Sequence, residues 1–155
     1  MKVGYVQNSP IFGEKEKNFA QIEKLTDNIQ ADLIVLPELF ATGYTCISKE
    51  EALNLAEKIN GDTSIFLQQI SQKTGAIIVG GFIEKEGSEI YNSSMMVFKE
   101  KIIGTYRKNK IAPFAIDCQK TLSFGIRVKL IKPANSIGPT PFQRVKLKYM
   151  ESNIG

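Results

Sequence analysis

The sequence contains no histidine and no tryptophan, and it has two cysteines, Cys46 and Cys118, among its 155 residues. Without histidine, catalytic mechanisms of the Ser-His and Cys-His types are excluded, and so are the usual zinc-binding spacings of cysteine and histidine. Any covalent catalysis by this chain therefore needs Glu or Lys to handle protons. Nothing in the sequence argues for an oxidising compartment, so a disulfide is not expected.

Long hydrophobic runs are also absent. No apolar run reaches the roughly 18 residues that a membrane-spanning helix needs, and Met1–Tyr5 has the pattern of a strand and not of a signal peptide. We expect a cytoplasmic chain that does not bind a membrane. Its 43% hydrophobic and 23% charged residues are typical of a globular protein with one modest core.

Basic residues are concentrated in the last third of the chain. Residues 1–98 contain 8 lysines and 13 acidic residues, whereas residues 99–155 contain 12 basic and 3 acidic residues. Such an asymmetry can indicate a nucleic-acid or other anionic partner. The basic residues are scattered singly, however, without interleaved aromatic side chains, which favours a solvated basic face over nucleic-acid binding.

Hydrophobic periodicity predicts a strand, a helix and a second strand at the start of the chain. Residues 2–7 have the pattern of a strand, and residues 14–30 carry the apolar stripe of an amphipathic helix. Residues 33–36 form a continuous apolar run, which is typical of a strand covered on both faces. This order predicts a βαβ unit whose two strands pair in parallel.

Two more helices and a hairpin are expected in the next part of the chain. Ser48 and Glu51 form a capping box that opens a helix extending to Gly61, and a second helix ends at Gly75. Strand patterns follow at residues 76–79, 82–84, 90–98 and 102–107, the last two joined as a hairpin or meander. The predicted fold class is therefore α/β, with a mixed sheet and helices packed on it.

Glu38 follows the buried strand at its carboxyl end, where α/β sheets place their chemistry. Pro37 has no amide hydrogen and ends the strand one residue earlier. Apolar residues flank Glu38, so we expect partial desolvation, which raises the pKa of a carboxyl group and makes it a usable base. The alternative is a structural carboxylate that caps or pairs. Phe40 and Tyr44 are candidate aromatic walls of a substrate pocket.

Lys108 stands at the end of the last predicted strand, after Tyr106 and Arg107. An ammonium group at a strand end and close to a carboxylate can stabilise a developing oxyanion. The alternative is an ordinary basic surface.

Gly80 and Gly81 follow the third predicted strand and allow another backbone segment to come close. A phosphate-binding P-loop is not indicated, because no Gly-Lys-Ser or Gly-Lys-Thr follows these glycines.

The segment Leu36–Tyr44, LPELFATGY, resembles the glutamate motif of the nitrilase superfamily, the carbon-nitrogen hydrolases. Further segments are similar to this family in their order and separation over about the first 110 residues. Met1–Val6 resembles the family's first strand, and Ile78–Phe82 resembles its third strand. Tyr91–Ser94, followed by Gly104–Lys108, resembles its lysine segment. The resemblance implies a nitrilase-like half of an α-β-β-α sandwich.

The same resemblance implies hydrolysis of an amide or nitrile by a site of the Glu-Lys-Cys type. Glu38 is then the general base and Lys108 the oxyanion-stabilising lysine, with Asn92, Phe40 and Tyr44 as substrate contacts. The expected substrate is a small amide, carbamoyl compound or nitrile. Neither a metal nor a cofactor is required.

The nucleophile segment departs from the family pattern. No stretch after Lys108 resembles the family's strand-end cysteine followed by Phe-Pro-Glu, and Lys110 stands where the family has a histidine. Cys118 lies ten positions after Lys108 without a following Pro-Glu, and it is a candidate substitute nucleophile on a loop. Cys46 is expected to be a small buried side chain.

Pro133–Asn135 resembles a later family segment, which implies that the intervening strand and helix are missing. We expect residues 1–125 to be the N-terminal part of a carbon-nitrogen hydrolase domain and residues 126–155 a remnant of a later segment. The favoured interpretation is a truncated or internally deleted hydrolase that is impaired or inactive. The alternative is a non-catalytic binding or assembly module with a basic C-terminal surface. Uncovered hydrophobic surface predicts self-association into homo-oligomers.

Overall fold

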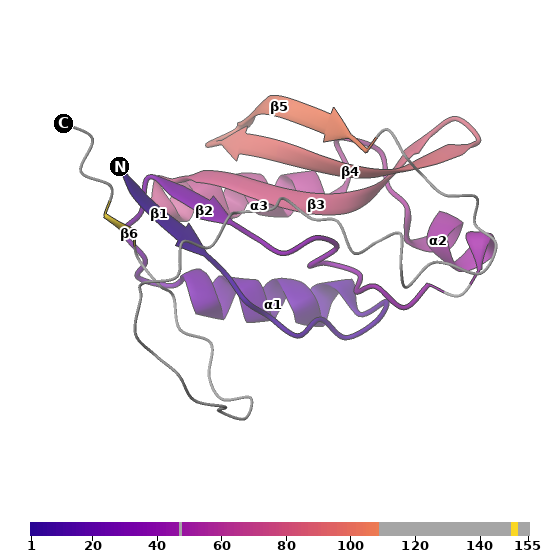
Figure 1. The fold of residues 1–155 in the computed structure, drawn as a ribbon, viewed down its shortest axis with the longest axis horizontal. Coiled ribbons are helices and arrows are strands. Elements are labelled where there is room, and N and C mark those ends of the chain that lie inside the picture. Colours follow the sequence, from indigo (N-terminus) through magenta and orange to yellow (C-terminus); the bar gives the residue numbers. More distant parts are fainter. Residues whose placement is uncertain (47, 109–149, 152–155) are drawn as a thin grey trace, which may run out of the picture.

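The computed structural model describes residues 1–46, 48–108 and 150–151. Within these residues one sheet carries all the strands, in the order β5-β4-β3-β2-β1-β6, and helices pack against it (Figure 1). In chain order the elements are β1 (Lys2–Tyr5), α1 (Lys15–Thr26), β2 (Leu33–Val35), α2 (Lys49–Leu55), α3 (Asp62–Thr74), β3 (Ile77–Glu86), β4 (Glu89–Phe98), β5 (Lys101–Arg107) and β6 (Met150–Glu151).

The sheet is mixed because its two halves are connected differently. β1, β2 and β3 pair in parallel, since helices carry the chain back between them. β3, β4 and β5 follow one another directly and pair antiparallel, and β6 pairs antiparallel with β1. The predicted α/β class with a mixed sheet is confirmed. The two strand patterns predicted at residues 76–79 and 82–84 form one continuous strand, β3.

Two helices end earlier than the sequence predicts. α1 stops at Thr26 because the backbone of Asp27 is extended and Asn28 adopts a left-handed φ of 60°. Ser48 is confirmed as the N-cap of α2, since the Glu51 amide donates to Ser48 Oγ at 3.1 Å. α2 nevertheless ends at Leu55 and not near Gly61, because the backbone of Glu57 hydrogen-bonds to the free edge of β3.

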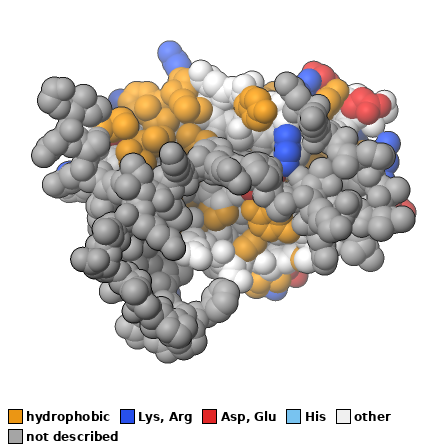
Figure 2. Space-filling model, viewed as in Figure 1, with side chains coloured by type: hydrophobic (Ala, Val, Ile, Leu, Met, Phe, Trp, Pro, Cys, Tyr) orange, Lys and Arg blue, Asp and Glu red, His pale blue; other side chains and the backbone are white. Residues whose placement is uncertain are grey.

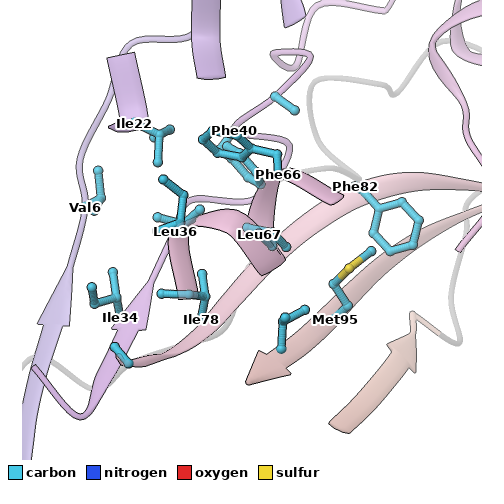
Figure 3. Packing of buried hydrophobic residues seen from close by; sticks show 14 residues of the cluster. Val6, Ile22, Ile34, Leu36, Phe40, Phe66, Leu67, Ile78, Phe82 and Met95 are labelled. Atoms are coloured by element: carbon cyan, nitrogen blue, oxygen red, sulfur yellow. The ribbon is translucent and has the colours of Figure 1, made fainter. Parts of the chain in front are cut away.

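The main core lies between one face of the sheet and helices α1 and α3. It contains Ile22 of α1, Leu67 of α3 and Ile78 of β3, all with no exposed surface (Figure 3). Three aromatic rings join the two helices, because the ring of Phe19 stacks on Phe66 at 4.1 Å and both lie about 6.2 Å from Phe40. Phe40 comes from the loop after β2, so this loop is anchored by the core.

Among the residues that the structure describes, no helix is both long enough and apolar enough to span a membrane.

Gly80 of β3 makes room for this aromatic cluster. A Cβ at residue 80 would lie 2.9 Å from Phe40 Cε1 and 3.1 Å from Leu67 Cδ1, which are buried side chains. We expect Gly80→Ala to lower the free energy of unfolding by about 1–3 kcal/mol through overpacking. Urea denaturation followed by circular dichroism measures this difference.

Gly104→Ala is the matched control, because a Cβ at residue 104 meets only Met96 Cβ at 3.9 Å. This variant should be neutral or more stable by up to about 1 kcal/mol, as alanine restricts the unfolded chain. Equal effects of the two substitutions would show that the space over Gly80 is not tightly packed.

Candidate functional site

Glu38 lies in a sharp turn where β2 ends. The Leu36 amide still donates to the Val79 carbonyl at 2.8 Å, and the chain then leaves the sheet after Pro37. Leu39 adopts a left-handed φ of 49°, which is uncommon for a residue with a branched side chain. The preceding residue, Glu38, is half-buried, whereas the following residue, Phe40, is fully buried.

The backbone of Glu38 rests directly on β3. A Cβ at Gly81 would lie 3.2 Å from Glu38 Cα and 3.3 Å from the Leu39 nitrogen, so only glycine fits here without displacing the turn. A Cβ at Gly80 would meet Phe40. The close backbone approach that the glycine pair predicts is confirmed, and its partner is the turn that carries Glu38.

Asn18 of α1 holds this turn from the other side. Its side chain has no exposed surface, and its Nδ2 donates to the carbonyls of Ala41 at 2.7 Å and Ile11 at 2.8 Å. Its Oδ1 accepts from the Ile11 amide at 2.8 Å. Asn18 was not among the site residues predicted from the sequence. Its position four residues before Ile22, on the inward face of an amphipathic helix, is the signal that could have found it.

Asn92 and Lys108 reach Glu38 from β4 and from the end of β5. The Lys108 amide donates to the Asn92 carbonyl at 2.9 Å, which extends the register of Ser93 opposite Arg107 by one pair. Side chains of directly opposed residues leave a sheet on the same face. Asn92 Nδ2 donates to Glu38 Oε1 at 2.5 Å, so this face is the one that carries Glu38.

Three physical effects act on the Glu38 carboxyl. Desolvation is the largest and raises its pKa, while the Asn92 hydrogen bond and the positive charge of Lys108 lower it, and the net pKa is raised. The predicted desolvation of Glu38 is confirmed. Burial and the negative charge of Glu38 together raise the pKa of Tyr44 to about 12. Tyr44 and Lys108 therefore both lie within electrostatic reach of Glu38.

The structure places the remaining candidates as follows. Phe40 packs in the core, with no exposed surface, and does not line the space beside the carboxylate. Tyr44 is 37% exposed. Cys46 is 2% exposed and packs with Leu39 and Ile83, as expected for a small buried side chain. Cys118 lies outside the described residues.

Other predictions also fall outside the described part of the chain. They concern Lys110, the segment Pro133–Asn135, the domain boundary at residues 125–126 and the basic C-terminal surface. Among the residues that are described, no group of three or more His, Cys, Asp or Glu side chains could hold a metal ion.

Comparison with known proteins gives one family. The model of the carbon-nitrogen hydrolase family matches residues 2–134. A nitrilase from Pyrococcus abyssi is 44% identical over 112 residues, which cover 70% of this chain and 43% of the nitrilase. A 2-oxoglutaramate amidase from Bacillus subtilis is 32% identical over 101 residues, which cover 63% of this chain and 38% of the amidase. The chain thus spans less than half the length of these relatives.

Solved structures share the fold. An N-terminal amidase superposes with a TM-score of 0.66 and 24% identity, covering 74% of this chain and 29% of the amidase. A carbon-nitrogen hydrolase from Helicobacter pylori superposes with a TM-score of 0.64 and 24% identity, covering 76% of this chain and 43% of the hydrolase.

The raised pKa of Glu38 makes the stability of the protein depend on pH. Folding favours the protonated carboxyl, so the contribution of Glu38 to stability is fully present below its ordinary pKa of 4.5 and is lost as pH rises through its folded value. We expect Glu38→Gln to match the wild type at acidic pH and to have the higher free energy of unfolding near neutrality. Urea denaturation at a series of pH values tests this.

Glu89→Gln removes an exposed carboxylate and controls for the change in net charge. A gap between wild type and Glu38→Gln that is the same at every pH would contradict the assigned cause.

Proposed function

This chain belongs to the carbon-nitrogen hydrolase family, with a nitrilase-like fold, and we propose that it hydrolyses a small amide, carbamoyl compound or nitrile at Glu38 and Lys108. The observation that carries this proposal is that Lys108, seventy positions away in the sequence, lies close enough to Glu38 for its positive charge to lower the pKa of that carboxyl. A base and a cation at one site can serve proton transfer and oxyanion stabilisation together.

For an amide substrate, the chemistry proceeds in two halves. Glu38 accepts a cysteine thiol proton as sulfur bonds to the carbonyl carbon, and Lys108 stabilises the negative charge that moves onto the carbonyl oxygen. The intermediate then collapses, Glu38 returns the proton to the departing nitrogen, and a thioester remains. Water, deprotonated by Glu38, attacks the thioester and releases the acid and the thiol.

Two further side chains support this proposed site. Asn92 donates to Glu38 Oε1 and so orients the carboxylate and stabilises its ionised form. Amide contact of Asn92 with substrate would use its remaining donor and its oxygen. The ring of Tyr44, 37% exposed beside Glu38, offers an apolar wall to the substrate. Phe40 supports the site indirectly, because its burial in the core anchors the turn that carries Glu38.

We propose that turnover is impaired at the nucleophilic step. Cys46 is buried in a hydrophobic cluster, which leaves Cys118 as the cysteine available to attack a substrate. Cys118 does not have the sequence that surrounds the family's nucleophile. A nucleophile that is not held in line with its base loses most of the advantage of proximity.

Ammonia release from a panel of small primary amides and nitriles tests the proposal on the full chain. We expect slow release that Glu38→Gln, Lys108→Met and Cys118→Ser each reduce to the buffer background. Loss of one oxyanion-stabilising group alone typically costs a factor of about 100–1,000. Cys46→Ala should retain the wild-type rate. Ammonia release that survives in Glu38→Gln or Lys108→Met would place the activity elsewhere.

A second candidate function, assembly, is favoured by exposed apolar side chains on β4 and β5. Met96 and Phe98 are 39% and 38% exposed, and they alternate with Val97, which is buried in the core. They therefore project from the face opposite α1 and α3. On the face turned to the viewer, hydrophobic side chains gather at the upper left (Figure 2). We propose that the face of β4 from which Met96 and Phe98 project mediates self-association.

Analytical ultracentrifugation over a range of concentrations tests self-association. We expect the wild type to form dimers or larger species and Met96→Thr/Phe98→Thr to shift toward the monomer, because the variant loses apolar surface. Ile65→Thr removes a side chain of α3 that is 49% exposed and should leave association unchanged. A compact wild-type monomer at high concentration contradicts this second candidate.

A further inference from the structure

We propose that Glu84 and Arg107 are positioning residues whose ion pair, on the face of the sheet that packs against α1 and α3, holds Lys108 beside Glu38 on the other face. This inference rests on the proposed function, since it assigns the two residues a role through Lys108. Arg107 directly precedes Lys108 and is the last residue of β5. Successive residues of a strand point to opposite faces, so the two side chains serve different sides of the sheet.

The ion pair between Arg107 and Glu84 is bidentate and joins three strands. Arg107 Nε donates to Glu84 Oε2 at 2.9 Å and Arg107 Nη2 donates to Glu84 Oε1 at 2.6 Å, a bidentate arrangement. Ser93 Oγ also donates to Glu84 Oε2 at 2.6 Å. Residues of β3, β4 and β5 are therefore joined at one level of the sheet. The guanidinium carbon lies 4.3 Å from the centre of the Tyr91 ring.

The burial of Glu84 restricts where the Arg107 guanidinium can lie. Glu84 is 5% exposed, and a buried carboxylate without its cation is costly. Arg107 and Ser93 together hold the pKa of Glu84 below its ordinary value, so the carboxylate is ionised and needs Arg107 in place. Arg107 also donates to Glu86 at 2.8 Å, but the Glu86 side chain is 64% exposed and contributes less.

β5 needs such a constraint because it is the edge strand and its register is interrupted. It hydrogen-bonds to β4 alone within the described sheet, and its pairing shifts between Met96 and Val97. A slip by one residue at the end of β5 would turn Lys108 to the face that packs against α1 and α3. The Arg107–Glu84 pair opposes this slip, because the slip would separate the Arg107 guanidinium from the buried Glu84 carboxylate.

The titration of Glu38 reports whether Lys108 is in place. Lys108 lowers the pKa of Glu38, so Lys108→Met should raise it. Glu84→Gln has two effects of opposite sign: loss of a negative charge would by itself lower the pKa of Glu38, whereas displacement of Lys108 raises it. Tyr44, the other titrating group that faces Glu38, is unchanged in these variants. A merely structural role of Glu84 would lower stability without raising the Glu38 pKa.

The experiment is NMR titration of the full chain labelled with ¹³C at the glutamate carboxyl carbons, with Glu38 assigned from Glu38→Gln. We expect Glu84→Gln and Arg107→Lys to raise the Glu38 pKa in the direction of Lys108→Met. Arg107→Lys keeps the positive charge and removes the bidentate fork, so it decides the question if Glu84→Gln does not fold. Glu86→Gln removes the same charge from the exposed partner of Arg107 and should have little effect.

The outcomes separate this inference from the proposed function. If Lys108→Met raises the Glu38 pKa but the folded Glu84→Gln and Arg107→Lys variants do not, the positioning role is overturned and the Glu38–Lys108 site stands. If Lys108→Met leaves the Glu38 pKa unchanged, the pairing on which the proposed function rests is overturned, and the positioning role with it.

Discussion

The contact between the Glu38 turn and the central strand β3 is the constraint on which the site depends. Gly81 allows the Glu38 backbone to lie on the strand. Asn18 ties the loop after Glu38 to α1 through its buried hydrogen bond to the Ala41 carbonyl. Contact with the sheet removes the carboxyl group from water and raises its pKa. A looser turn would leave Glu38 as an ordinary solvated carboxylate with little value as a base.

The alternation of side chains along β3 and β4 lets one segment serve the core and the site together. Gly80 faces Phe40 and the helices, while the next residue, Gly81, faces the backbone of Glu38. Val97 and Met95 of β4 are buried in the core, and Asn92 lies on the face with Glu38. Packing on one face thus sets the position of polar groups on the other, because neither can move without the shared backbone.

Local chemistry made much of this arrangement predictable from sequence. Pro37 predicts the end of a strand, Gly80 and Gly81 predict the close approach of another backbone segment, and the apolar residues around Glu38 predict its desolvation. The features that were missed depend on partners distant in the sequence. α2 ends at Leu55 because Glu57 finds the edge of β3, and Phe40 turns into the core because Leu39 adopts a left-handed conformation. Likewise, the pairing of Glu84 with Arg107 depends on the register of β3, β4 and β5, which the sequence does not specify.

The balance of charges around Glu38 suits the proposed reaction. Before proton transfer, Lys108 lies near the negative carboxylate and lowers its pKa, which keeps a desolvated base usable. When Glu38 accepts a proton, its negative charge disappears as a new one forms on the substrate oxygen. Lys108 then has a negative partner both before and after the transfer, so the surrounding protein needs little rearrangement. A fixed cation that serves two successive anions is the kind of preorganised electrostatics that lowers a reaction barrier, provided that the register of β5 keeps it in place.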